Sequence, residues 1–117
     1  MYDEFDELKG KIIRKVMVSK NNDELVFITN DERRYTFYHE QDCCENVLIE
    51  DICGDFNDLL DVPLLEAEEV TDTGWGECDE SCTWTFYKFG TIKGSVTVRW
   101  LGESNGYYSE GVSLLIE

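Results

Sequence analysis

The chain has 117 residues and a formal net charge of −16, from 26 acidic and 10 basic side chains. Its length suits one domain with a single core, and a hydrophobic fraction of 42% argues against disorder. Direct binding to nucleic acid or to an anionic membrane is disfavoured, because both surfaces require cationic contacts. We therefore predict one folded domain spanning residues 1–117.

The amino-terminal residues read MYDEFDE, which lacks the basic and then apolar pattern of a signal peptide. No apolar run approaches the roughly 20 residues that are needed to span a bilayer. These two observations predict a cytoplasmic protein, in which cysteine thiols normally stay reduced.

Residues 10–39 predict a three-stranded antiparallel meander, with turn residues between alternating apolar runs. The expected strands are Ile12–Val18, Leu25–Thr29 and Arg33–His39. Because side chains alternate across a strand, the third strand should place Tyr35, Phe37 and His39 on one face.

The middle of the chain predicts one short helix. Asp51, Asp55, Asp58 and Asp61 recur at spacings of four, three and three residues, which would line one acidic face of a helix. Pro63 would end that helix because it lacks an amide donor. The segment before it, residues 46–51, fits either a short strand or the approach to the helix, and residues 64–71 fit a strand.

The carboxy-terminal part is strongly β in character from Thr83 onward. Val96, Val98 and Trp100 alternate with Thr97, Arg99 and Leu101, the pattern of a half-buried antiparallel strand. Asn105-Gly106 predicts a tight turn. The whole chain is therefore predicted to be α+β, mainly antiparallel sheet with one short central helix.

A window between Tyr35 and Tyr87 holds the only histidine, all five cysteines and 15 acidic residues, with no Lys or Arg. His39, Cys43, Cys44 and Cys53 have the ligand types of a structural zinc site, and Cys78 and Cys82 form a second pair at ligand spacing. Surrounding carboxylates would favour a bound cation.

Two other interpretations of these residues stay open. The cysteines can be small buried side chains beside a hydrogen-bonded His39. A disulfide is the other interpretation, although five cysteines cannot all pair within one chain.

No catalytic residue is predicted. The residues around His39 and Cys43 carry no cysteine-hydrolase signature, and the sequence has no phosphate-binding Gly-rich loop, calcium loop or HExxH helix. We expect a protein that is not an enzyme, with a Cys-dependent enzyme using Cys43 or Cys44 as an alternative.

The acidic residues predict a partner-binding surface. Rows of carboxylates can enter the basic channel of a nucleic-acid-binding protein and act as a DNA mimic. The alternative is an ordinary solubilising surface. The candidate residues are Asp51, Asp55, Asp58, Asp61, Glu66, Glu68, Glu69, Glu77, Asp79 and Glu80.

Four segments resemble an uncharacterised family of small bacteriophage proteins. They are YHEQDCCE (38–45), VLIEDICGD (47–55), TWTFYKF (83–89) and RWLGESNGYYSE (99–110). The resemblance implies action in the cytoplasm of a host bacterium. The combination is similar to zinc-containing anti-CRISPR proteins that inhibit the type II RNA-guided nuclease.

This resemblance implies a function and a metal site as expectations. The protein would bind the basic nuclease and block the loading or binding of target DNA. His39, Cys43 and Cys44 are positions shared with the family, which favours a zinc site of His39, Cys43 and Cys53, with Cys44 as a further candidate. A phage structural or interaction protein braced by zinc is the alternative.

Overall fold

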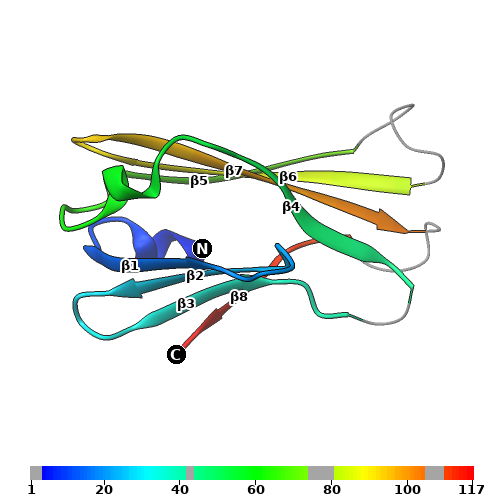
Figure 1. Cartoon of the computed structure of the whole chain (residues 1–117), viewed down its shortest axis with the longest axis horizontal. Coiled ribbons are helices and arrows are strands. Elements are labelled where there is room, and N and C mark those ends of the chain that lie inside the picture. Colours follow the sequence, from blue (N-terminus) through cyan, green and yellow to red (C-terminus); the bar gives the residue numbers. More distant parts are fainter. Residues whose placement is uncertain (1–3, 42–43, 74–80, 105–109) are drawn as a thin grey trace.

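The chain folds as two antiparallel sheets packed face to face (Figure 1). The computed structural model describes residues 4–41, 44–73, 81–104 and 110–117, and the elements below lie within them. One sheet has the strand order β1-β2-β3-β8, with bounds Ile13–Val18, Glu24–Thr29, Arg34–Tyr38 and Ser113–Ile116. The other has the order β4-β7-β6-β5, with bounds Asn46–Cys53, Gly94–Ser104, Ser81–Thr91 and Glu66–Thr73.

The predicted amino-terminal meander is confirmed. β1 pairs with β2 and β2 pairs with β3, all antiparallel. The turns contain Asn22 at φ 60° and Glu32 at φ 64°, in the left-handed region that asparagine adopts more readily than most residues. β8 then pairs with β3, so the end of the chain completes the sheet that its beginning starts.

The predicted α+β class is wrong, because both layers are β-sheets and the described residues form no α-helix. The segment predicted to be helical divides into the end of β4 and a short 3-10 helix, η2 (Phe56–Leu59). Asp55 caps η2 by accepting a hydrogen bond from the Asn57 amide at 2.9 Å. The aspartate spacing therefore belongs to an edge strand and an exposed connection.

The connection after η2 closes one end of the sandwich. Pro63 forms a bridge with Ile12, ahead of β1. The buried Leu64 donates its amide to the Lys11 carbonyl and accepts from the Gly10 amide, both at 2.8 Å. Pro63 thus joins the two sheets where a helix end was predicted.

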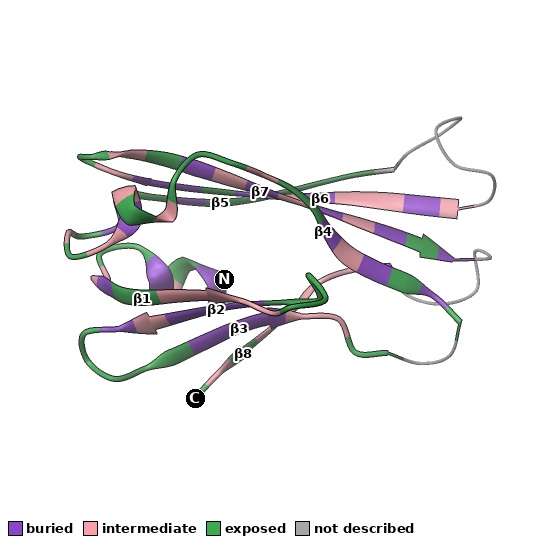
Figure 2. Cartoon of the chain, in the orientation of Figure 1, coloured by how far each residue is buried: buried purple, intermediate pink, exposed green. Residues whose placement is uncertain are grey.

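An aromatic cluster fills the space between the sheets, where buried residues from both layers meet (Figure 2). The Phe27 and Phe89 ring centroids are 4.9 Å apart, and so are those of Phe37 and Tyr87. Phe5, from the 3-10 helix η1 (Glu4–Leu8), packs against rings of both sheets. Tilted and edge-to-face contacts of this kind stabilise a core beyond the area that they bury.

Strand alternation decides which side chains enter this core. Val96, Val98 and Trp100 on β7 are buried, which confirms their predicted alternation. On the neighbouring β6, Tyr87 and Phe89 are buried, so Trp84 and Phe86 face away from the core. Both faces of β6 therefore carry aromatic side chains.

This orientation can be tested with two substitutions of the same residue type on one strand. Phe89→Ala removes a buried ring and should lower the free energy of unfolding by about 3–5 kcal/mol. Phe86→Ala, on the outward face, should cost about 1 kcal/mol. Urea unfolding of the non-reduced protein measures both. Equal losses would show that Phe86 faces the core.

Candidate functional site

The negative charge is concentrated in one part of the chain. Residues 1–39 have eight acidic and seven basic side chains, whereas residues 40–117 have 18 acidic and three basic ones. All four strands of the β4-β7-β6-β5 sheet come from the second part. That sheet, its connections and the segments flanking β8 therefore carry nearly all of the net charge.

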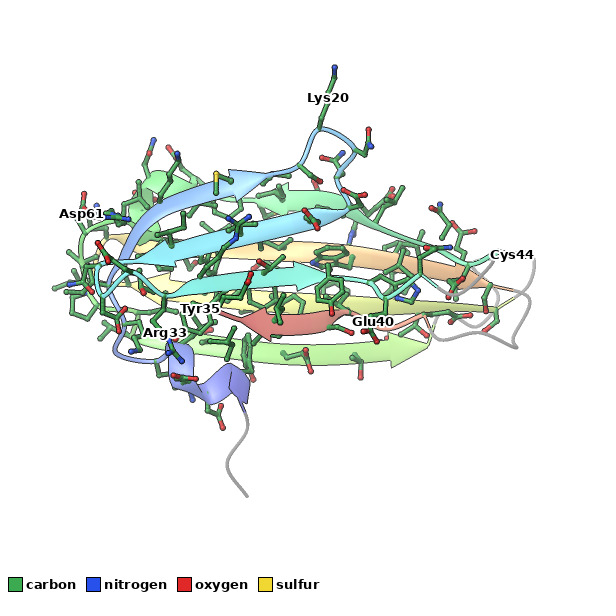
Figure 3. The ribbon with its side chains drawn as sticks, turned by 90° about the horizontal axis from the view of Figure 1, so that it is seen from below. Lys20, Arg33, Tyr35, Glu40, Cys44 and Asp61 are labelled. Carbon is green, nitrogen blue, oxygen red and sulfur yellow. The ribbon has the colours of Figure 1, made fainter. Side chains whose placement is uncertain are left out.

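The predicted partner-binding carboxylates surround this sheet. Asp51 lies on the edge strand β4, whereas Glu66, Glu68 and Glu69 lie on the opposite edge strand β5. The connection between these strands holds Asp55, Asp58 and Asp61. Figure 3 shows Asp61 at the end of the molecule opposite Cys44. The remaining predicted residues, Glu77, Asp79 and Glu80, lie outside the described residues.

Between the acidic edges, the sheet presents large apolar side chains on its outward face. The strand register aligns Leu48, Leu101 and Trp84 in one row across β4, β7 and β6. In the next row Phe86 lies opposite Val70 of β5. We call these five residues the outer apolar face. All are partly exposed, and Val70 is 43% exposed.

Arg99 lies within this face. Its Cζ is 5.0 Å from the centroid of the Trp84 ring, a cation–π distance. Its guanidinium is 4.0 Å from the Asp51 carboxylate, and its Nε is buried with no hydrogen-bond partner among the described residues. The Asp51 carboxylate and the Trp84 indole are therefore both stabilising neighbours of this cation.

The outer apolar face was not predicted from the sequence. Its signal is the segment TWTFYKF, in which both alternating sets of positions contain aromatic residues. A strand with one solvated face usually alternates apolar with polar residues. Aromatic residues in both phases of β6 indicate that neither face of the strand is simply solvated.

His39 and Cys53, two of the predicted zinc ligands that the structure describes, lie far apart. The two ring nitrogens of His39 are hydrogen-bonded, Nδ1 to the Gly111 carbonyl at 2.7 Å and Nε2 to Glu45 Oε2 at 3.0 Å. Cys53 ends β4, whereas Glu45 directly precedes it. A strand advances about 3.3 Å per residue, which places Cys53 about 25 Å from Glu45.

The fold prediction also included a zinc brace, which the described residues do not form. Across the described ranges, no group of three or more His, Cys, Asp or Glu side chains is placed to hold a metal ion. His39 instead agrees with the alternative prediction that it is a hydrogen-bonded residue. Cys43 and Cys78 lie outside the described residues.

The cysteines that the structure describes are in two states. Cys44 and Cys82 are each disulfide-bonded, whereas Cys53 is a free, exposed thiol. A disulfide sulfur is neither a thiolate ligand nor a nucleophile. Disulfides persist in oxidising environments, which differs from the reduced thiols expected from the sequence.

Buried carboxylates hold the end of the sandwich near Cys44. Glu110 accepts hydrogen bonds from Thr83, at 2.7 Å, and from Ser104. Burial, the largest influence, raises the pKa of the Glu110 carboxyl, but hydrogen bonds from Ser104, Thr83 and Ser81 together hold it below its ordinary value. Glu110 is therefore an ionised, hydrogen-bonded part of the structure, unlike the exposed acids of the edges.

These features define the class of the protein as an all-β sandwich with one strongly acidic sheet. A family model matches residues 6–114, and the chain belongs to that family, described as a domain of unknown function (DUF7448). No curated protein and no solved structure gave a match. No helix in the described part of the chain is both long and apolar enough to cross a membrane.

The His39–Glu45 contact should contribute measurably to stability. His39→Phe removes the imidazole from a carboxylate whose side chain is 0% exposed, and should cost about 3 kcal/mol. Adding Glu45→Leu should restore part of that loss, because the buried charge is then removed as well. Denaturant titrations of the single and double variants measure the coupling. Strictly additive effects would contradict the pairing.

Cysteine accessibility provides a second test. In native, non-reduced protein, iodoacetamide should alkylate Cys53, because its thiol is exposed and free. Cys44 and Cys82 should be alkylated only after reduction. Peptide mapping by mass spectrometry distinguishes these sites. Alkylation of Cys44 without reductant would contradict the disulfide assignment.

Proposed function

We propose that this protein is an acidic, phage-encoded inhibitor that acts in the cytoplasm of the host bacterium. It binds a basic, nucleic-acid-handling effector, the type II CRISPR RNA-guided nuclease, and blocks the loading or binding of target DNA. The supporting observation is the charge distribution, with 18 acidic and three basic side chains in residues 40–117. The resemblance to small phage proteins supports the choice of effector.

The positions of the carboxylates fit this role. Asp51 and Glu68 are exposed on opposite edge strands of one sheet. The Asp51 carboxylate is 4.0 Å from the Arg99 guanidinium, and Glu68 forms no ion pair with any described residue. A type II nuclease holds its guide and target in positively charged channels. Charges of opposite sign accelerate the encounter of two proteins and lose this effect as salt rises.

The redox state of the cysteines is a condition that must be controlled when binding is measured. Cys44 and Cys82 are disulfide-bonded, whereas a bacterial cytoplasm keeps thiols reduced. Binding should therefore be measured with both oxidised and reduced protein. The acidic residues Asp51 and Glu68 lie on strands, so we expect their contribution to be retained in both states.

Binding to the guide-loaded nuclease is the direct test. The two proteins should co-elute in size-exclusion chromatography, and the complex should fail to shift target DNA on a native gel. Affinity should fall steadily between about 0.05 and 0.5 M salt, because screening weakens attraction between exposed charges. The absence of a complex at micromolar concentrations, or affinity independent of salt, would refute the proposal.

Two matched pairs of charge-reversal substitutions test which sheet contributes to binding of the nuclease. Asp51→Lys/Glu68→Lys should weaken binding at least tenfold. Glu24→Lys/Glu117→Lys changes the net charge equally but alters the other sheet and the chain end, so it should have a much smaller effect. Asp55 and Asp58 are unsuitable for this test, because Asp55 caps η2 and the Asp58 carboxylate packs against Gly94.

A further inference from the structure

The outer apolar face spans the four strands of the acidic sheet. Its five members are Leu48, Val70, Trp84, Phe86 and Leu101, aligned by the pairing of four adjacent strands. A carboxylate lies at one end of each row. Asp72 follows Trp84 across the sheet, and Asp51 precedes Arg99 in the row that continues to Phe86. The arrangement is a band of apolar residues across the sheet with carboxylates at its edges, and it also contains Arg99 and borders Lys88.

We infer that the outer apolar face is the docking surface for a basic protein partner, and that the surrounding carboxylates form the rim of that interface. This inference rests on the proposed function and adds the surface by which the partner is held. Protein interfaces commonly have an apolar centre and a polar rim. Tryptophan and arginine are enriched among the residues that contribute most to binding; Trp84 belongs to this face and Arg99 lies over its ring.

The surface is also preorganised. Trp84 and Phe86 project from one strand, with ring centroids 6.5 Å apart and an interplanar angle of 25°. Arg99 lies over the Trp84 ring and restricts its orientation. Both aromatic residues belong to β6, an interior strand with hydrogen-bonded neighbours on both sides. Little conformational entropy is then lost when a partner binds.

Charge selects the kind of occupant. A second copy of the chain would bring two acidic rims together, and like charges facing each other across an interface oppose association. An anionic membrane or a nucleic acid would be repelled for the same reason. A basic protein surface with exposed apolar side chains complements both the centre and the rim, so we commit to that occupant.

Substitutions on the outer apolar face provide the test. Val70→Thr and Phe86→Thr keep residues that favour strands but remove apolar contact area. Together they should weaken binding to the guide-loaded type II nuclease at least tenfold, without changing the slope of affinity against salt. The control is Leu115→Thr on β8, because Leu115 is 45% exposed and Val70 is 43% exposed. It should change affinity less than twofold.

Cys53 provides a second measurement in the unsubstituted protein. It is exposed and pairs with Thr97, whose row continues to Lys88 beside the outer apolar face. A benzophenone maleimide attached to Cys53 should crosslink to the nuclease on illumination. This measurement does not depend on the folding of any variant. Thermal melts of the variants identify any that lose affinity through unfolding.

The outcomes separate the two proposals. If the unsubstituted chain forms no complex, the proposed function fails and the docking proposal fails with it. If a complex forms but Val70→Thr/Phe86→Thr binds equally well and Cys53 does not crosslink, only the docking surface is refuted. If the chain alone sediments as a dimer that these substitutions dissociate, a second copy occupies the face, and the inference is overturned.

Discussion

The pleat of β6 links the core of this protein to its surface. Tyr87 and Phe89 must enter the aromatic cluster that joins the two sheets, and side chains two residues apart share a face. Trp84 and Phe86 then face outward, because a shift of one residue would exchange the two sets. The outer apolar face is thus determined by the same register that builds the core.

The acidic residues divide into two groups with different roles. Glu45 and Glu110 are buried, and hydrogen bonds from His39, Gln41, Thr83 or Ser104 satisfy their carboxylates at one end of the sandwich. Most of the other acids on the β4-β7-β6-β5 sheet are exposed at its edges. Self-repulsion among exposed charges disfavours the compact state. The folded chain therefore maintains a concentration of negative charge that salt ions screen and that an oppositely charged surface would complement.

Local sequence patterns predicted the strands. They did not predict which side chains come together when the strands pair. The meander and β7 follow from short-range alternation. The aspartate spacing suggested a helix, but Asp51 lies on an edge strand and the later aspartates lie on the connection after it, so they do not share one helical face. Residue type suggested zinc, but β4 separates Cys53 from His39 and Glu45. Aromatic residues occupy both alternating sets of positions on β6, so the sequence did not show which face of this strand enters the core. The pairing with β7 shows it.

The two components of the proposed interface act on different steps of binding. Carboxylates at the edges act over the Debye length of about 8 Å in physiological salt, and so influence mainly the rate of encounter. The outer apolar face acts only in contact, and changes in such contacts alter mainly the rate of dissociation. Asp51 and Val70 therefore belong to one surface but contribute to different rate constants. A strand scaffold suits this division, because it holds the rim and the centre in fixed register.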